Sequence, residues 1–208
     1  MPGTVSEDQL ATALRGHQAV AVDNSVSAFL DHHARVSVVM ATGTGKTLVA
    51  LHVAHRIAPL GNVVLFAPNI QLLYQTAQVW HREGRRGLYL TICHEDARGV
   101  LPGGVLRIGS AEELAHHAAG AAAFGPLNVF CTYQSQEKVE QAHRDHHLAR
   151  WDLIICDFTN RHVGVCDVRV EWSAGVGEGC GLGSEGAAGG AVLGLRGRHA
   201  GGWSVGGG

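Results

Sequence analysis

Lysine is scarce in this sequence. Of the 16 Lys and Arg residues, only Lys46 and Lys138 are lysines. The formal net charge is −2, so neither a general attraction to nucleic acid nor one to an anionic membrane is indicated. Any contact with DNA or RNA therefore has to be local.

Long apolar runs are absent as well. No run approaches the roughly 20 residues that span a bilayer, and the N-terminus lacks the basic and apolar segments of a secretory signal. The five cysteines never form a C-x-x-C pair, and three of them lie in or beside apolar runs, as buried thiols do in a reducing compartment. These absences predict a cytoplasmic protein that does not contact a membrane.

Short apolar runs alternate with amphipathic segments between residues 35 and 157. The runs are mostly continuous and rich in Val, Leu and Ile, which is typical of strands covered on both faces. The strands are predicted at residues 36–40, 63–67, 88–93, 128–132 and 153–157. The helices are predicted at residues 46–57, 70–83, 111–119 and 134–148. This alternation predicts an α/β protein whose parallel sheet carries helices on both faces.

Two helix starts carry a capping signal. Ser110 and Glu113 form an S-x-x-E capping box at the start of the third predicted helix. Ser6 and Gln9 repeat the pattern near the N-terminus, so residues 1–34 are predicted to form a helical lead-in to the sheet.

Residues 40–47 read Met-Ala-Thr-Gly-Thr-Gly-Lys-Thr and join a predicted strand to a predicted helix. This is the context that a phosphate-binding loop requires. Gly43 and Gly45 allow successive N–H groups to face phosphate oxygens, and the following helix adds its positive dipole end. Lys46 is expected to reach the β- and γ-phosphates and Thr47 to ligate Mg²⁺. The strict G-x-x-x-x-G-K-[ST] pattern is not met, because Met40 replaces its first glycine.

This loop variant resembles motif I of superfamily 2 helicases, notably the branch of type III restriction subunits and DEAH-type translocases. Residues 14–22 resemble the adenine-reading segment, with Gln18 pairing with the base edge. Residues 67–76 and 130–135 are similar to motifs Ia and Ib. In the family these two motifs contact the nucleic-acid backbone through main-chain amides and hydroxyls, which requires no basic stripe.

The resemblance implies a RecA-like lobe with ATP and Mg²⁺ as cofactors and nucleic acid, DNA rather than RNA, as a weakly bound partner. The implied ATP-binding residues are Gln18, Thr42, Gly43, Thr44, Gly45, Lys46 and Thr47. The implied metal-site residues are Thr47 and Asp157, which hold Mg²⁺ through ATP. The implied nucleic-acid contacts are Pro68, Asn69, Gln75, Thr132, Tyr133 and Gln134.

The resemblance breaks down directly after Asp157. The family continues this strand end as Asp-Glu-Ala-His, whereas Phe158 stands at the position of the Glu that polarises the attacking water. Loss of a general base slows a reaction by roughly 10²–10⁴-fold, and the arginine finger of the second lobe, worth on the order of 10³–10⁵, is also missing. The family is an ATP-dependent hydrolase, but this chain is predicted to bind ATP without hydrolysing it alone, and no catalytic residue is assigned. A second helicase lobe that acts in trans is a candidate partner.

Residues 158–208 have a different composition from the rest of the chain. The segment from Arg161 onward contains 16 of the 29 glycines, which makes ordering costly and favours a disordered tail. Arginine in place of lysine indicates GC-rich codons, and such DNA read out of frame yields Gly, Ala, Arg and Val. We therefore expect a chain truncated or frameshifted within motif II. The predicted divisions are a lead-in at 1–34, an ATP-binding lobe at 35–157 and a tail at 158–208.

Two other functions fit the phosphate loop. The chain could be a non-enzymatic, ATP-sensing partner of a complete motor, or a small P-loop phosphotransferase, although the tail supplies neither the arginines of a lid nor an acceptor site.

The 14 histidines lack zinc-ligand spacing, and those at 143, 146 and 147 are interpreted as lying on a solvated helix face. Tyr74 and Trp80 are expected to pack in the core.

Overall fold

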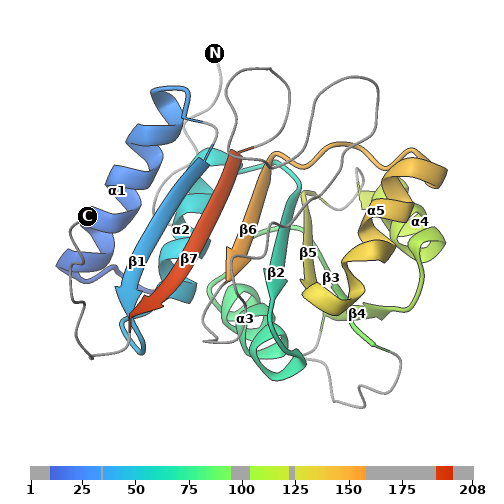
Figure 1. The fold of residues 1–208 in the computed structure, drawn as a ribbon, viewed down its shortest axis with the longest axis horizontal. Coiled ribbons are helices and arrows are strands. Elements are labelled where there is room, and N and C mark those ends of the chain that lie inside the picture. The colour runs from blue at the N-terminus through green and yellow to red at the C-terminus, as the bar shows by residue number, and fades with distance from the viewer. Residues whose placement is uncertain (1–9, 34, 95–103, 122–124, 158–190, 199–208) are drawn as a thin grey trace, which may run out of the picture.

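A computed structural model describes residues 10–33, 35–94, 104–121 and 125–157, and the backbone of residues 191–198. Its centre is a seven-stranded sheet in the order β1-β7-β6-β2-β5-β3-β4, and every neighbouring pair is parallel (Figure 1). The strands are β1 (Arg35–Ala41), β2 (Val63–Ala67), β3 (Leu88–Ile92), β4 (Val105–Ile108), β5 (Leu127–Thr132), β6 (Leu153–Asp157) and β7 (Ala191–Arg198). The helices are α1 (Gly16–Leu30), α2 (Lys46–Ile57), α3 (Ile70–Arg82), α4 (Ala111–Ala121) and α5 (Gln136–His146), with a 3₁₀ turn, η2, at Tyr133–Ser135.

Helices cover both faces of this sheet. In β2, Val63 and Leu65 belong to one buried cluster and Val64 and Phe66 to another, because successive side chains of a strand point to opposite faces. The first cluster also contains buried residues of α1, α2 and α3, and the second contains residues of α4 and α5. The prediction of a parallel sheet between two helical layers is therefore confirmed.

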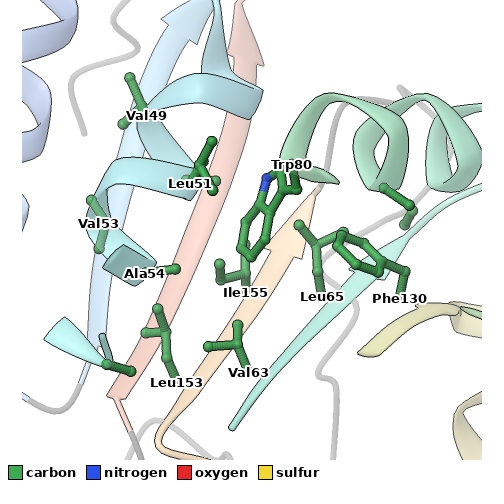
Figure 2. Packing of buried hydrophobic residues seen from close by; sticks show 14 of the residues in the cluster. Val49, Leu51, Val53, Ala54, Val63, Leu65, Trp80, Phe130, Leu153 and Ile155 are labelled. Carbon is green, nitrogen blue, oxygen red and sulfur yellow. The ribbon is translucent and has the colours of Figure 1, made fainter. Parts of the chain in front are cut away.

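The core between the sheet and α2–α3 is closely packed. Trp80 of α3 is fully buried and meets Phe130 of β5 edge-to-face, with 5.4 Å between the ring centroids. Figure 2 shows Trp80 beside Leu65 and Ile155, which come from two neighbouring strands. The expectation of a core position is confirmed for Trp80, whereas Tyr74 is only half-buried against this cluster.

A buried arginine fixes the far end of α2, the helix that begins at the phosphate loop. Arg85 Nη2 donates to the carbonyl oxygen of Ala58, the C-cap of α2, at 2.7 Å, and Arg85 Nε donates to Asn128 Oδ1 at 2.7 Å. Burial lowers the pKa of Arg85 to about 10, so the side chain stays cationic near neutral pH. A cation at a helix C-terminus stabilises the helix dipole.

The five predicted strands are all present, and no strand end differs from its predicted position by more than one residue. β4 was not predicted, because its four residues include Arg107 and only Val105 and Ile108 are buried. The capping box at α4 is confirmed for the hydroxyl, since Ser110 Oγ accepts from Glu113 N at 3.1 Å. The Glu113 carboxylate instead accepts from Gly109 N.

Helix boundaries give two further corrections. The helical lead-in is present as α1, which begins at Gly16, and the Ser6 capping signal lies outside the described residues. The predicted helix at 134–148 is shorter: η2 precedes α5, which ends at His146. His147 then adopts a left-handed conformation with φ of 54°, and this closes the helix.

The prediction that no regular structure follows Asp157 is wrong for residues 191–198. These residues form β7, which lies between β1 and β6 and pairs with β1 over residues 192–198 and with β6 over residues 191–195. Backbone hydrogen-bond ladders with β1 and β6 hold the strand. Its formation therefore depends on these neighbours rather than on the β-propensity of its glycine-containing sequence. Phe158 and the rest of the predicted tail lie outside the described residues.

Candidate nucleotide and nucleic-acid site

The loop after β1 has the backbone of a phosphate cradle. Gly43 and Gly45 have φ of 82° and 90°, a region that favours glycine because it has no Cβ. The hydroxyl and the amide of Thr44 both donate to the carbonyl oxygen of Ala41, at 2.6 and 3.4 Å. Gly45 then caps α2, whose first turn contains no acidic residue. The loop therefore lies at the N-terminus of α2, where the positive end of the helix dipole favours an anion.

Lys46 is buried at the start of α2, with 7% of its surface exposed. Among the described residues, the partner of its ammonium group is the neutral carbonyl oxygen of Ala41, at 3.3 Å. Burying a cation is costly unless an anion balances it. A buried lysine beside a helix N-terminus therefore fits the phosphates of a nucleotide. The neighbouring Thr47 is half-buried and Thr42 is exposed.

Gln18 lies against the phosphate loop rather than on an open surface. Its Oε1 accepts from Arg15 N at 2.9 Å, which caps α1, and its Nε2 donates to the carbonyl oxygen of Thr44 at 2.8 Å. The side chain is 3% exposed, so both ends of the amide are bound by the protein itself. A Cβ at Gly45 would collide with Gln18 Nε2. Pairing of Gln18 with a base edge remains a prediction.

His17 is a neighbour of this loop that the sequence reasoning missed. Its Nε2 donates to the same Thr44 carbonyl oxygen at 3.2 Å, and the ring is exposed. The sequence offers only a weak signal for this contact, namely its position beside Gln18. The first turn of α1 also contains no acidic residue.

Asp157 ends β6 at the same edge of the sheet as the phosphate loop. Through β7, Asp157 is in register with Leu195 and Leu195 with Val38 of β1. Strands are roughly 4.8 Å apart, so β6 lies about 10 Å from β1. The Asp157 side chain is buried. The predicted metal-site residues therefore lie at one edge of the sheet, Thr47 in the first turn of the helix that follows β1 and Asp157 at the end of β6.

The predicted nucleic-acid residues on the β2 side lie around the start of α3. Pro68 and Asn69 follow β2 directly. Asn69 Oδ1 accepts from Leu72 N at 2.8 Å, so the side chain of Asn69 is the N-cap of α3. Gln75 is exposed on α3.

The predicted residues after β5 divide between buried and exposed. Thr132 is buried, and its hydroxyl donates to Ser135 Oγ at 3.3 Å. Gln134 is exposed, and Tyr133 is half-buried. The Tyr133 hydroxyl donates to the carbonyl oxygen of Asp157 at 3.4 Å. The structure therefore joins the β5 turn to the end of β6, a connection that the sequence does not indicate.

Of the three helix-face histidines, His146 and His147 are exposed as expected, whereas His143 is half-buried. Its Nδ1 donates to the carbonyl oxygen of Leu148 at 2.9 Å, and its ring meets Trp151 edge-to-face. Burial lowers the pKa of His143 to about 4, against the opposing effect of the Leu148 hydrogen bond. The solvated interpretation is thus wrong for His143. Among the described residues, no three His, Cys, Asp or Glu side chains gather as a metal site would require.

The parallel sheet, the phosphate loop at the end of β1 and the aspartate at the end of β6 define a RecA-like lobe of the superfamily 2 helicase type. The chain belongs to the family described as type III restriction enzyme, res subunit, whose model matches residues 11–159. The match ends two residues beyond Asp157. Among curated proteins no match is found.

Solved structures of similar fold include two type ISP restriction-modification enzymes. LlaBIII, described as ATP-dependent and bound to DNA, has a TM-score of 0.65 at 25% identity over 89% of this chain and 12% of its own. A nuclease-deletion mutant of LlaGI in complex with a DNA substrate mimic has a TM-score of 0.64 at 23% identity, over 89% of this chain and 17% of its own.

A third similar structure is the helicase domain of Hef from Pyrococcus furiosus. Its TM-score is 0.53 at 21% identity, over 88% of this chain and 33% of its own. The chain thus spans a third or less of each of these structures. In the part of the chain that the structure describes, no helix has the length and apolarity to cross a bilayer.

Proposed function

We infer that this chain is the nucleotide-binding first lobe of a DNA-directed superfamily 2 helicase or translocase, and that it binds ATP·Mg²⁺ without hydrolysing it alone. The observation that carries the inference is the buried ammonium group of Lys46 at the start of α2, in a loop whose two glycines have positive φ. A nucleotide supplies the anion that this lysine lacks among its described partners.

The roles proposed for the chain's own residues follow from this placement. The main-chain amides of the loop and Lys46 would bind the phosphates, and Thr47 at the start of α2 and Asp157 at the end of β6 would hold Mg²⁺ at one edge of the sheet. Mg²⁺ would neutralise the phosphate charge when it is bound. Because Phe158 replaces the expected general base, we propose no catalytic residue in this chain.

The nucleic-acid partner is proposed on family and structural grounds. The family model matches most of the chain, and two enzymes of similar fold are described in complex with DNA or a DNA substrate mimic. The exposed residues Gln75 and Gln134 would lie beside the backbone of the bound strand. A second helicase lobe, supplied in trans, would complete the ATP cleft.

Nucleotide binding tests the proposal through the two lysines. Lys46→Ala is expected to weaken binding of a fluorescent ATP analogue by roughly 10-fold or more, since a hydrogen bond to a charged group contributes about 1.5–3 kcal/mol. Lys138→Ala, which removes the other lysine from α5, serves as the matched control and should bind as the wild type does. Equal affinity of wild type and Lys46→Ala would contradict the proposal.

A further inference from the structure

One side chain connects the two halves of the proposed site. Tyr133 follows β5, among the predicted nucleic-acid residues, and its hydroxyl donates to the carbonyl oxygen of Asp157 at 3.4 Å. Asp157 is the last residue of β6 and belongs to the proposed metal site. β5 and β6 are not neighbours, because β2 lies between them. The tyrosine therefore reaches across a whole strand.

The ring of Tyr133 is held in position by the strand that it crosses. It stacks on Phe66 of β2, with 6.0 Å between the centroids and 22° between the planes. Phe66 is fully buried and is paired with Cys131 on one side and Cys156 on the other. Cys131 precedes Tyr133 by two residues and Cys156 directly precedes Asp157, so the pairing of both strands with Phe66 brings the start of η2 close to the end of β6.

The two ends of this connection differ in their exposure. Asp157 is buried, Tyr133 is half-buried and the adjacent Gln134 is exposed at the surface. A strand of nucleic acid that contacts the turn at Gln134 would press on η2, the short turn in which Tyr133 lies. Displacement of η2 would be transmitted through the hydroxyl to the backbone of Asp157. Coupling of this kind requires a physical connection whose position both ligands affect.

We propose that Tyr133 is a positioning residue that couples nucleic-acid binding at the β5 turn to the metal-binding carboxylate of Asp157. The inference rests on the proposed function and specifies its regulation. The hydroxyl is the essential group, and the ring serves to hold it. The coupling is reciprocal, since an effect of the nucleic acid on Mg·ATP affinity equals the effect of Mg·ATP on nucleic-acid affinity.

The test is Tyr133→Phe, which removes the hydroxyl and keeps the ring that stacks on Phe66. The dissociation constant of a fluorescent ATP analogue is measured with Mg²⁺, with and without saturating oligo(dT), for the full chain. We expect oligo(dT) to change the wild-type constant by roughly fivefold or more, the lower end of usual coupling. In Tyr133→Phe the change should fall below about twofold.

Tyr74→Phe is the matched control. The Tyr74 hydroxyl lies 3.5 Å from Cys93 Sγ, close to the end of β3, so the substitution removes the same group near the same edge without touching Asp157. It should keep the wild-type coupling. Two readouts separate positioning from a structural role: the coupling should vanish in EDTA, and oligo(dT) alone should change amide exchange at the end of β6 in wild type but not in Tyr133→Phe.

The outcomes separate this inference from the proposed function. Wild-type coupling retained in Tyr133→Phe, or lost equally in Tyr74→Phe, would overturn the positioning role and leave the proposed function standing. A wild type that binds both ligands without coupling would do the same. A wild type that fails to bind Mg·ATP would overturn both.

Discussion

The side-chain amide of Gln18 donates to the main-chain carbonyl oxygen of Thr44 at 2.8 Å, and this joins the start of α1 to the phosphate loop. The other end of the same amide caps α1 through Arg15 N. A single buried glutamine thus fixes both a helix start and the loop. Because Gly45 follows Thr44 directly, any side chain at Gly45 would have to displace Gln18.

The first prediction compares the two loop glycines. Gly43→Ala should lower the free energy of unfolding by about 1–2 kcal/mol, the strain of an L-residue in the left-handed region. No steric cost is added, because a Cβ at this position meets nothing within 4 Å. Gly45→Ala should cost more than Gly43→Ala, because it also breaks the buried hydrogen bonds of Gln18. Urea denaturation of both variants measures the difference in the free energy of unfolding.

The control for this comparison is the Gln18→Ala background. With the glutamine removed, the gap between Gly45→Ala and Gly43→Ala should shrink to within roughly 0.5 kcal/mol, because the coupled partner is gone. If the difference in the free energy of unfolding persists in this background, contacts other than the one with Gln18 disfavour a side chain at Gly45.

The second prediction concerns the salt dependence of single-stranded DNA binding. If main-chain amides and polar side chains make the contacts, few phosphates are neutralised by Lys or Arg. The slope of log affinity against log salt should then be about −1 to −2, since each neutralised phosphate contributes roughly −0.7. Titrations of oligo(dT) at several salt concentrations measure the slope, and a value steeper than about −4 would indicate a basic surface elsewhere.

The strand predictions succeeded where a local signal and burial agree. β2 and the first four residues of β6 are continuous apolar runs, and both strands are buried throughout, which is the pattern expected of interior parallel strands. β4 has four residues and exposes two of them at the sheet edge, so its sequence contains too little signal. β7 is defined by the ladders of its two neighbours, which local composition does not reveal.

Prediction of the candidate site had a similar limit. The spacing of Gly43, Gly45 and Lys46 predicts the cradle because one segment contains the whole motif. The contacts of Gln18 with Thr44 and of Tyr133 with Asp157 join residues 26 and 24 positions apart. Such contacts depend on strand order and helix placement, and a single sequence does not specify either at that detail.

The third prediction separates the capping role of Asn69 from its proposed contact with nucleic acid. Asn69→Ala should lower the free energy of unfolding by about 1 kcal/mol, because the side chain no longer accepts from Leu72 N. Asn69→Ser preserves a capping oxygen and should retain most of the stability. Weaker oligo(dT) binding in Asn69→Ser would support a direct contact, whereas equal unfolding of both variants in denaturant would contradict the cap.

The fourth prediction is a loss of stability in mild acid caused by His143. Its folded pKa, about 4, lies below the ordinary value of about 6.5, so the unfolded chain binds more protons between these values. The contribution of the neutral His143 ring to the free energy of unfolding is therefore complete above about pH 6.5 and decreases as the pH falls towards 4. Its size should be on the order of 1 kcal/mol, because the part-exposed ring is screened by solvent.

Denaturation midpoints at pH 7 and pH 5 check this sign. When the pH is lowered from 7 to 5, the wild type should lose more stability than His143→Gln does. His146→Gln is the matched control, since His146 is exposed on the same helix, and it should lose as much as wild type. Identical losses in wild type and His143→Gln would show that the ring titrates normally in the folded chain.

The last prediction concerns restored hydrolysis. Thr47 at the start of α2 and Asp157 at the end of β6 lie at one edge of the sheet, whereas Phe158 stands where the family's water-polarising Glu is expected, and we propose that the arginine finger comes from a second lobe. Phe158→Glu alone should give little activity, because an arginine finger contributes on the order of 10³–10⁵ to the rate. A fusion after Asp157 that restores Glu-Ala-His and supplies both a family strand in the place of β7 and the family second lobe should give ATP hydrolysis that oligo(dT) stimulates. Adding Lys46→Ala to the fusion should abolish that activity and exclude a contaminating ATPase. Steady, oligo(dT)-stimulated hydrolysis by the unmodified chain would instead show that it already contains a complete catalytic set.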